Sequence, residues 1–272
     1  MKQLFVAFLS LSVFVLTSCT KVDDNYGYVS IRFVHEVNGS LLVMDTMQYQ
    51  NEAGNYFSVT DLKYFISDFT LTRSDGSKIS LGEDSKIHYV DHNNAETMMW
   101  QLPDSIPVGV YKSISFTFGL DEATNQSGLF STPPESNMEW PTGLGGGYQY
   151  MKMDGCYASQ IGGNYTPYQF YLGIGQIHPS QGLGADEVTY VQNYFTVTLN
   201  DIRFELDKSE DLVVNLFMEI ENWMQTPHVW DFYSVGAIIA NNQEAQLMAK
   251  ENGSNVFSAA VDESRDEPRD SH

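Results

Sequence analysis

The chain has little cysteine and little positive charge. Cys19 and Cys156 are its only cysteines in 272 residues, which excludes a small scaffold held together by disulfides. Lysine and arginine number 14 against 35 aspartates and glutamates, so the formal net charge is −21. A surface this acidic repels nucleic acid and anionic lipid headgroups, and we therefore expect neither as a partner.

Long apolar runs are also scarce, with one exception at the N-terminus. Lys2 precedes an apolar run from Leu4 to Leu16, which is typical of a secretory signal peptide and too short for a membrane-spanning helix. The run leads into Thr17-Ser18-Cys19, which resembles the bacterial lipobox. We therefore expect residues 1–18 to be a lipoprotein signal peptide and residues 19–27 to be a tether lipidated on Cys19.

Several acyl chains would hold such a protein on a membrane, since each buried methylene contributes ~0.8 kcal/mol. The expected location is the outer membrane, with the protein facing either the periplasm or the cell surface.

Motifs of the common enzyme classes are missing from the sequence. It has no Gly-x-Ser-x-Gly elbow, no His-Glu-x-x-His and no glycine-rich phosphate loop before a helix. Gly145–Gly147 comes before a predicted strand, so no helix dipole is available there for an anion. We therefore expect a protein without catalytic activity.

Alternation of apolar and polar residues recurs along most of the chain and predicts β-strands. Long strands are expected at Val188–Leu206 and Leu212–Met224, and helical spacing predicts one helix over Val235–Lys250. The pattern predicts an all-β domain over residues 28–258, a single large β-sandwich of roughly nine to twelve strands with Greek-key-like connections and one C-terminal helix. Residues 259–272 are expected to be a disordered acidic tail.

The stretch from Thr132 to Gly155 is the densest in glycine, proline and aromatic residues. Proline fixes backbone dihedrals and glycine permits positive φ, so we expect a structured loop that leads into a strand over Tyr148–Met153. Aromatic rings on such a loop can engage a glycan or a protein partner. The candidate binding residues are Trp140, Tyr148, Gln149, Tyr150 and Tyr171.

Sulfur donors cluster just after this loop. Met151, Met153 and Cys156 lie within six positions of one another, as Cu(I) favours, although methionine more often fills gaps in cores. His35 ends the apolar face of the first predicted strand and is either a metal ligand or bonded to a carbonyl.

Two further segments carry polar side chains that metals use. We expect His88 and His92 to be solvated loop histidines, because an i, i+4 pair has no fixed geometry in a strand. Residues 121–128 offer oxygen donors for a hard cation, with an ordinary solvated turn the favoured interpretation.

These segments carry a resemblance to a known family. The chain resembles the MbnP-like family of exported copper-associated proteins in the motifs Pro133-Pro134-Glu135-Ser136-Asn137-Met138, Trp140-Pro141 and Gly145-Gly146-Gly147-Tyr148-x-Tyr150-Met151-Lys152, and, in order along the chain, in Gln48–Ile66, Phe116–Asp121 and Leu172–Gln176. The resemblance implies a lipid-anchored envelope protein that binds or handles metal, with copper favoured.

The chain departs from this family at two positions. Many relatives have histidine where this chain has Gln149 and Tyr171. If those histidines are copper ligands, a site here needs His35 together with Met151, Met153 or Cys156. The alternative is a surface lipoprotein that has lost the metal site and binds a glycan or a protein through its aromatic loop.

Overall fold

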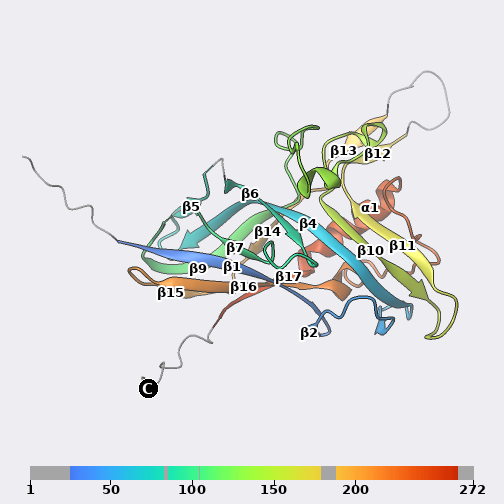
Figure 1. The fold of residues 1–272 in the computed structure, drawn as a ribbon, viewed down its shortest axis with the longest axis horizontal. Coiled ribbons are helices and arrows are strands. Elements are labelled where there is room, and N and C mark those ends of the chain that lie inside the picture. Colours follow the sequence, from blue (N-terminus) through green and yellow to red (C-terminus); the bar gives the residue numbers. More distant parts are fainter. Residues whose placement is uncertain (1–24, 83–84, 104, 179–187, 263–272) are drawn as a thin grey trace, which may run out of the picture.

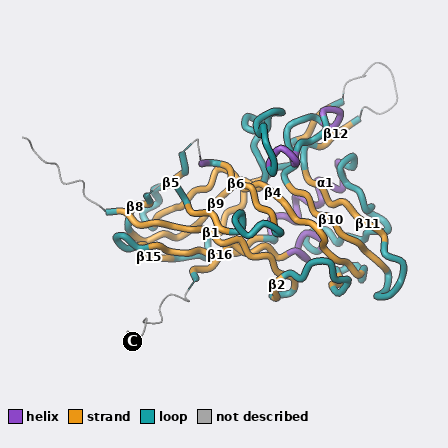
Figure 2. Tube along the Cα trace, viewed as in Figure 1, coloured by secondary structure: helices purple, strands orange, loops and turns teal. Residues whose placement is uncertain are grey.

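The computed structural model describes residues 25–82, 85–103, 105–178 and 188–262, which form two main β-sheets (Figure 1). Strands dominate the fold, as the colouring of Figure 2 shows, and the predicted all-β sandwich is confirmed. The predicted signal peptide and the predicted lipidation site, Cys19, fall outside the described residues. Within the described residues, no helix combines the length and the apolar character needed to cross a membrane.

The first sheet is built around β1. Its strand order is β17 (Phe257–Val261), β16 (Asp211–Glu219), β1 (Tyr26–Val37) and β2 (Ser40–Leu41), with β7 (Met99–Gln101) and β8 (Ile106–Pro107) also paired to β1. The long pairing of β1 with β16 is parallel and joins the two ends of the domain.

The second sheet is built around the long strand β4. Its order is β11 (Thr166–Leu172), β10 (Met151–Ala158), β4 (Tyr56–Arg73), β9 (Gly109–Phe118) and β14 (Phe195–Leu199). Shorter strands add to it: β3 (Tyr49–Gln50), β5 (Lys78–Ser80) and β6 (Ile87–Asp91) pair with β4, and β15 (Phe204–Leu206) pairs with β9. A separate hairpin pairs β12 (Gly175–Ile177) with β13 (Thr189–Val191).

Two loops attach to β4 between the residues that pair with β3 and those that pair with β6. The amide of Asp45 donates to the carbonyl of Val59, at 2.8 Å, and the amide of His92 donates to the carbonyl of Leu62, at 3.0 Å. The same two loops also bond to β1, because Leu42 donates to His35 and Phe33 donates to Met98. They therefore cross between the sheets at one edge of the sandwich, beside His35.

The C-terminal helix is shorter than predicted. Helix α1 covers Gln243–Asn252, with the side chain of Asn242 accepting a bond from the Ala245 amide as its N-cap. The preceding segment is a loop because Gln169 of β11 bonds to Ala237 and Ile239, so these backbone groups are used by the sheet and not by a helix.

The predicted long strands are also interrupted. Val188–Leu206 contains β13, β14 and β15, and the break before β14 holds the fully buried Asn193, whose amide donates to the carbonyl of Gly173. Leu212–Met224 changes after β16 into a 3₁₀ helix over Ile220–Met224. β1 starts at Tyr26 and β17 reaches Val261, so these two strands extend a few residues past the predicted limits of 28 and 258.

Candidate functional site

The loop of residues 132–150 is packed and does not present its aromatic rings to solvent. Trp140 is buried, and its Nε1 donates to the carbonyls of Leu144 and Ile174 at 3.1 and 3.0 Å. Its ring lies against Gly173, where a Cβ would come within about 3.0 Å of the indole. The loop is therefore held against the end of β11.

Tyr148 and Tyr150 are buried in the same way, with exposed fractions of 1% and 0%. The hydroxyl of Tyr148 accepts from the Phe130 amide at 2.8 Å, and the hydroxyl of Tyr150 donates to Gln192 at 2.8 Å. The prediction that Trp140, Tyr148 and Tyr150 form an exposed binding platform is therefore wrong, because their rings and polar atoms are used inside the fold.

Residues 121–128 form hydrogen bonds that hold the loop of residues 132–150 in place. The side-chain oxygen of Asn125 accepts from the Tyr148 amide at 2.7 Å, and the hydroxyl of Ser127 accepts from the Gly147 amide at 2.8 Å. Gly147 has a φ of 74°, and a Cβ there would overlap Asn125. Two of the oxygens that the sequence offered to a cation are thus committed to holding a glycine turn.

Tyr171 and Gln149 occupy the two positions where the family resemblance leads us to expect histidine. The hydroxyl of Tyr171 donates to both carboxylate oxygens of Asp154, at 2.7 and 2.8 Å, and Lys152 lies over its ring at 5.3 Å. Burial raises the pKa of Tyr171, and Asp154 raises it further. Gln149 is buried, and its side-chain oxygen has no hydrogen-bond partner.

The three sulfur donors do not converge. Met151 and Met153 are fully buried in the core, opposite Tyr64 and Leu62 of β4. Side chains alternate along a strand, so the half-buried Cys156 faces the other side of β10. The three therefore cannot form one three-sulfur site, as their order along the strand already implies.

His35 instead meets a second histidine. Its Nδ1 lies 2.7 Å from the Nδ1 of His92, and its Nε2 lies 2.9 Å from the hydroxyl of Tyr64. His35 comes from β1, Tyr64 from β4 and His92 from the turn after β6, so the cluster joins the two sheets. We call His35, His92 and Tyr64 the histidine pair site.

The site is neutral near pH 7. Burial, together with a smaller effect of His92, lowers the pKa of His35 to about 3. Burial also lowers the pKa of His92, against an opposing effect of Asp91. Burial raises the pKa of Tyr64 well above its usual value. Both imidazoles therefore keep a lone pair, which is the form in which histidine binds metals.

The contacts restrict the tautomers. A hydrogen bond between the two Nδ1 atoms needs a proton on one of them only. If both Nδ1 atoms are to face a metal, the proton of His35 must sit on Nε2 and donate to the oxygen of Tyr64. Tyr64 is therefore placed to fix the tautomer of His35, as outer partners of metal-bound histidines do.

The expectation that His88 and His92 are solvated loop residues is wrong. His92 contacts His35, and the ring of His88 is stacked between Phe33 and Trp100 with centroid separations of 5.2 and 4.8 Å. The Nε2 of His88 lies 2.8 Å from the carbonyl of Thr97. His88 therefore supports the loop that carries His92.

The sequence does not distinguish His92 from a solvated loop histidine, because its position depends on distant contacts. The amide of His92 bonds to Leu62 of β4, and its ring meets a strand 57 residues earlier. The only local signal is its place directly after a predicted strand, which is shared by many solvated residues.

The pair has limits as a metal site. In the part of the chain that the structure describes, no three or more histidine, cysteine, aspartate or glutamate side chains are grouped to hold a metal. The 2.7 Å between the Nδ1 atoms is a hydrogen-bond distance, whereas two nitrogens on one tetrahedral ion are about 3.3 Å apart for bonds of 2.0–2.1 Å. The donor chemistry suits copper, but one ring has to move.

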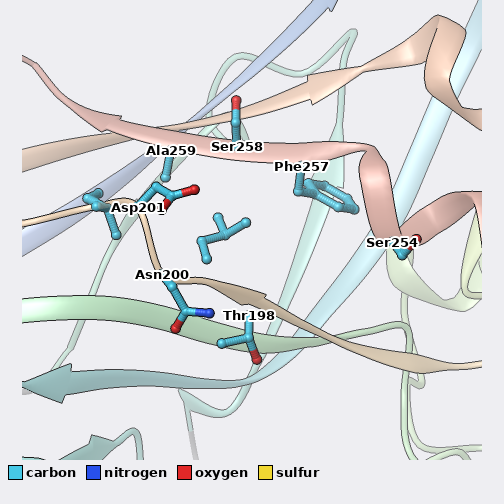
Figure 3. A pocket seen from close by; sticks show the side chains of 9 residues that line it. Thr198, Asn200, Asp201, Ser254, Phe257, Ser258 and Ala259 are labelled. Atoms are coloured by element: carbon cyan, nitrogen blue, oxygen red, sulfur yellow. The ribbon is translucent and has the colours of Figure 1, made fainter.

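A cavity lies elsewhere in the fold. It has a volume of about 380 Å³ and opens between the β14–β15 loop and β17, with Asn200, Asp201 and Phe257 in its lining (Figure 3). Neither histidine of the pair contributes to its lining, so it is separate from the histidine pair site.

Comparisons with known proteins agree on one family. The family model described as MbnP matches residues 26–246. Among solved structures, the fold is similar to that of MbnP from Methylosinus trichosporium, with a TM-score of 0.54 and 13% identity over 86% of this chain and 98% of that chain. No curated protein matches the sequence.

Proposed function

The chain belongs to the MbnP family, and we propose that it binds and handles copper at the bacterial cell envelope without catalysing a reaction. The ion is the cargo of the protein in this proposal. The observation that carries it is the contact of His35 with His92, since two neutral imidazoles from different elements point their Nδ1 atoms at one another.

Imidazole nitrogen is a good ligand for copper, and each ring keeps one nitrogen lone pair because neither is protonated near pH 7. Both lone pairs face an ion between the Nδ1 atoms once the proton of the hydrogen bond between the rings has moved to an Nε2. The burial of His35 excludes water from one side of the pair. The half-burial of His92 leaves the other side accessible. An ion can therefore approach the pair from the His92 side.

The ring that moves is that of His92. His35 sits within a paired strand and is held by Tyr64 at its Nε2, whereas His92 lies in the turn that follows β6. A rotation of the His92 side chain widens the gap between the Nδ1 atoms and leaves the bond from the His92 amide to the Leu62 carbonyl of β4 in place. Copper would replace the hydrogen bond between the two rings.

The test is copper binding by the purified protein. Under anaerobic conditions, Cu(I) is competed against a chromophoric chelator for the wild type, His35→Gln, His92→Phe and the control His178→Gln, whose histidine is exposed on another part of the surface. We expect one copper per chain in the wild type and the control and loss of that copper in the two site variants. Wild-type protein that binds no copper at micromolar concentrations refutes the proposal, as do site variants that bind like the control.

The envelope location rests on the lipobox-like Cys19. We expect full-length protein made in a bacterial host to fractionate with membranes and to incorporate labelled fatty acid. Cys19→Ser should remove the label and release the protein from the membrane fraction. Unchanged labelling of Cys19→Ser would refute lipidation at this residue.

The burial of the aromatic loop argues against the alternative function, which is a glycan or protein contact made through that loop. Trp140, Tyr148 and Tyr150 are buried and hydrogen-bonded within the fold. A glycan platform requires exposed ring faces, which these residues do not offer.

A further inference from the structure

We propose that the thioethers of Met44 and Met98 complete the ligand set at the histidine pair and make the site selective for Cu(I). This inference rests on the proposed function, because it concerns the same site. Both residues lie on the two loops that cross the edge of the sandwich, and neither belongs to the methionines that the sequence motifs single out.

The pair needs further donors from another residue type. Two imidazoles supply two bonds, and no additional histidine, cysteine, aspartate or glutamate joins them among the described residues. Tyr64 is committed to the Nε2 of His35, and a neutral phenol is a poor copper ligand. Thioether sulfur is the remaining soft donor that proteins use for Cu(I).

Met98 is placed beside the pair by strand register. Strand β7 pairs Trp100 with Ile31 of β1, and the bond from the Phe33 amide to the Met98 carbonyl, at 3.0 Å, continues this ladder. Met98 is therefore opposite Phe33, which faces the core. His35 follows Phe33 on the same face, and diagonal neighbours about 7–8 Å apart are within reach of a long side chain.

Met44 approaches from the other loop. The bond from the Leu42 amide to the His35 carbonyl, at 2.9 Å, sets Leu42 opposite His35. Leu42 is buried, Val43 is 51% exposed and Met44 is half-buried against the core, so side chains alternate and Met44 points inward like Leu42. The next residue, Asp45, bonds to β4, which holds Met44 in the crossing between the sheets.

Half-burial distinguishes these methionines from those of β10. Met151 and Met153 have no exposed surface and serve the core, whereas Met44 and Met98 are partly open to solvent at the edge where His92 is also accessible. Their thioethers can therefore meet an incoming ion before it reaches the buried His35. Because methionine has three rotatable bonds, the sulfur can adjust to a ring that moves.

The geometry predicts a preference among metals. A site of two imidazoles and thioether sulfur holds Cu(I) with all its donors but holds Zn²⁺ through the nitrogens alone, since thioethers are soft ligands. Replacing both methionines by leucine should therefore weaken Cu(I) binding and leave Zn²⁺ binding unchanged. Leucine conserves the volume, so the fold should persist.

The experiment compares full-length wild type, the double variant Met44→Leu/Met98→Leu and the control Met99→Leu, whose side chain is exposed on the opposite face of β7. Cu(I) and Zn²⁺ affinities are measured by chelator competition, and X-ray absorption at the copper edge reports sulfur neighbours. We expect the double variant to lose at least about tenfold in Cu(I) affinity, the lower end of what even outer partners of a metal contribute. It should also lose the sulfur signal, while the control keeps both.

Two results overturn the inference alone. Copper that is bound by the wild type with nitrogen neighbours only, or a double variant that matches Met99→Leu, would refute the methionine ligands while leaving the histidine pair intact. Wild-type protein that binds no copper overturns the proposed function and this inference together.

Discussion

Acid should destabilise the protein through His35. The pKa of His35 is about 3 in the folded protein, chiefly because of burial, against about 6.5 in an unfolded chain. Between these values the unfolded chain binds a proton that the folded protein does not. The stabilisation that His35 provides is therefore complete above pH 6.5 and is lost as the pH falls towards 3.

The size of this loss follows from linkage. Below pH 6.5, each unit of pH lowers the free energy of unfolding by about 1.4 kcal/mol for every proton that the unfolded chain binds and the folded protein does not. Between pH 7.5 and 5.0 the loss from His35 alone is about 2 kcal/mol, a large share of the 5–15 kcal/mol by which such domains are usually stable. Burial also lowers the pKa of His92, which adds to the loss in the same direction.

The assay is urea unfolding at pH 7.5, 6.5 and 5.0, followed by fluorescence of the buried tryptophans. His35→Gln removes the titrating group, and the exposed His178→Gln serves as the control. We expect the wild type and the control to lose about 2 kcal/mol more than His35→Gln over this interval. The absolute stability of His35→Gln does not matter, because only the change with pH is compared.

A wild type that loses no more stability than His35→Gln would refute the reasoning. It would mean that His35 is solvated, or already charged, in the folded protein. The contact with His92 would then not be the neutral pair on which the proposed copper binding depends.

Three further changes test the packing of the fold, the first of them at the histidine pair site. Tyr64→Phe removes the hydroxyl that contacts Nε2 of His35 and should cost about 1–3 kcal/mol in urea unfolding, because a buried nitrogen loses its partner. Gly155→Ala should lower the melting temperature far more than Gly76→Ala, since a Cβ at position 155 overlaps a neighbouring carbonyl whereas position 76 is open and only its positive φ is strained. Trp140→Phe removes two hydrogen bonds to carbonyls and should cost about 1–3 kcal/mol, measured in the same way.

The sheet content of the fold was predictable because alternation is a local signal. The strands over Val29–His35 and Phe57–Thr72 lie inside β1 and β4. The parallel pairing of β1 with β16 was not predictable. It joins residues about 180 positions apart, and no local sequence pattern identifies one strand as the partner of the other. The helix over Val235–Lys250 was overestimated because Gln169 of β11 takes up the backbone groups of its first half.

The candidate site was predictable only in part. His35 stands out because it ends an apolar strand face, and the structure gives it a partner. His92 does not stand out, because its contact depends on how a turn attaches to β4. The error over Trp140, Tyr148 and Tyr150 has a different cause. A dense loop of aromatics can either display its rings or bury them, and composition does not distinguish the two outcomes.

The position of Tyr171 changes how the missing histidines bear on copper. Tyr171 lies opposite Lys152 and therefore on the face of the sheet away from Met151. Met151 is opposite Tyr64, whose hydroxyl reaches His35, so the histidine pair is on the Met151 face. A histidine at position 171 would thus be separated from His35 by the sheet itself. The tyrosine at this position therefore leaves the histidine pair untouched and does not count against the copper site proposed there.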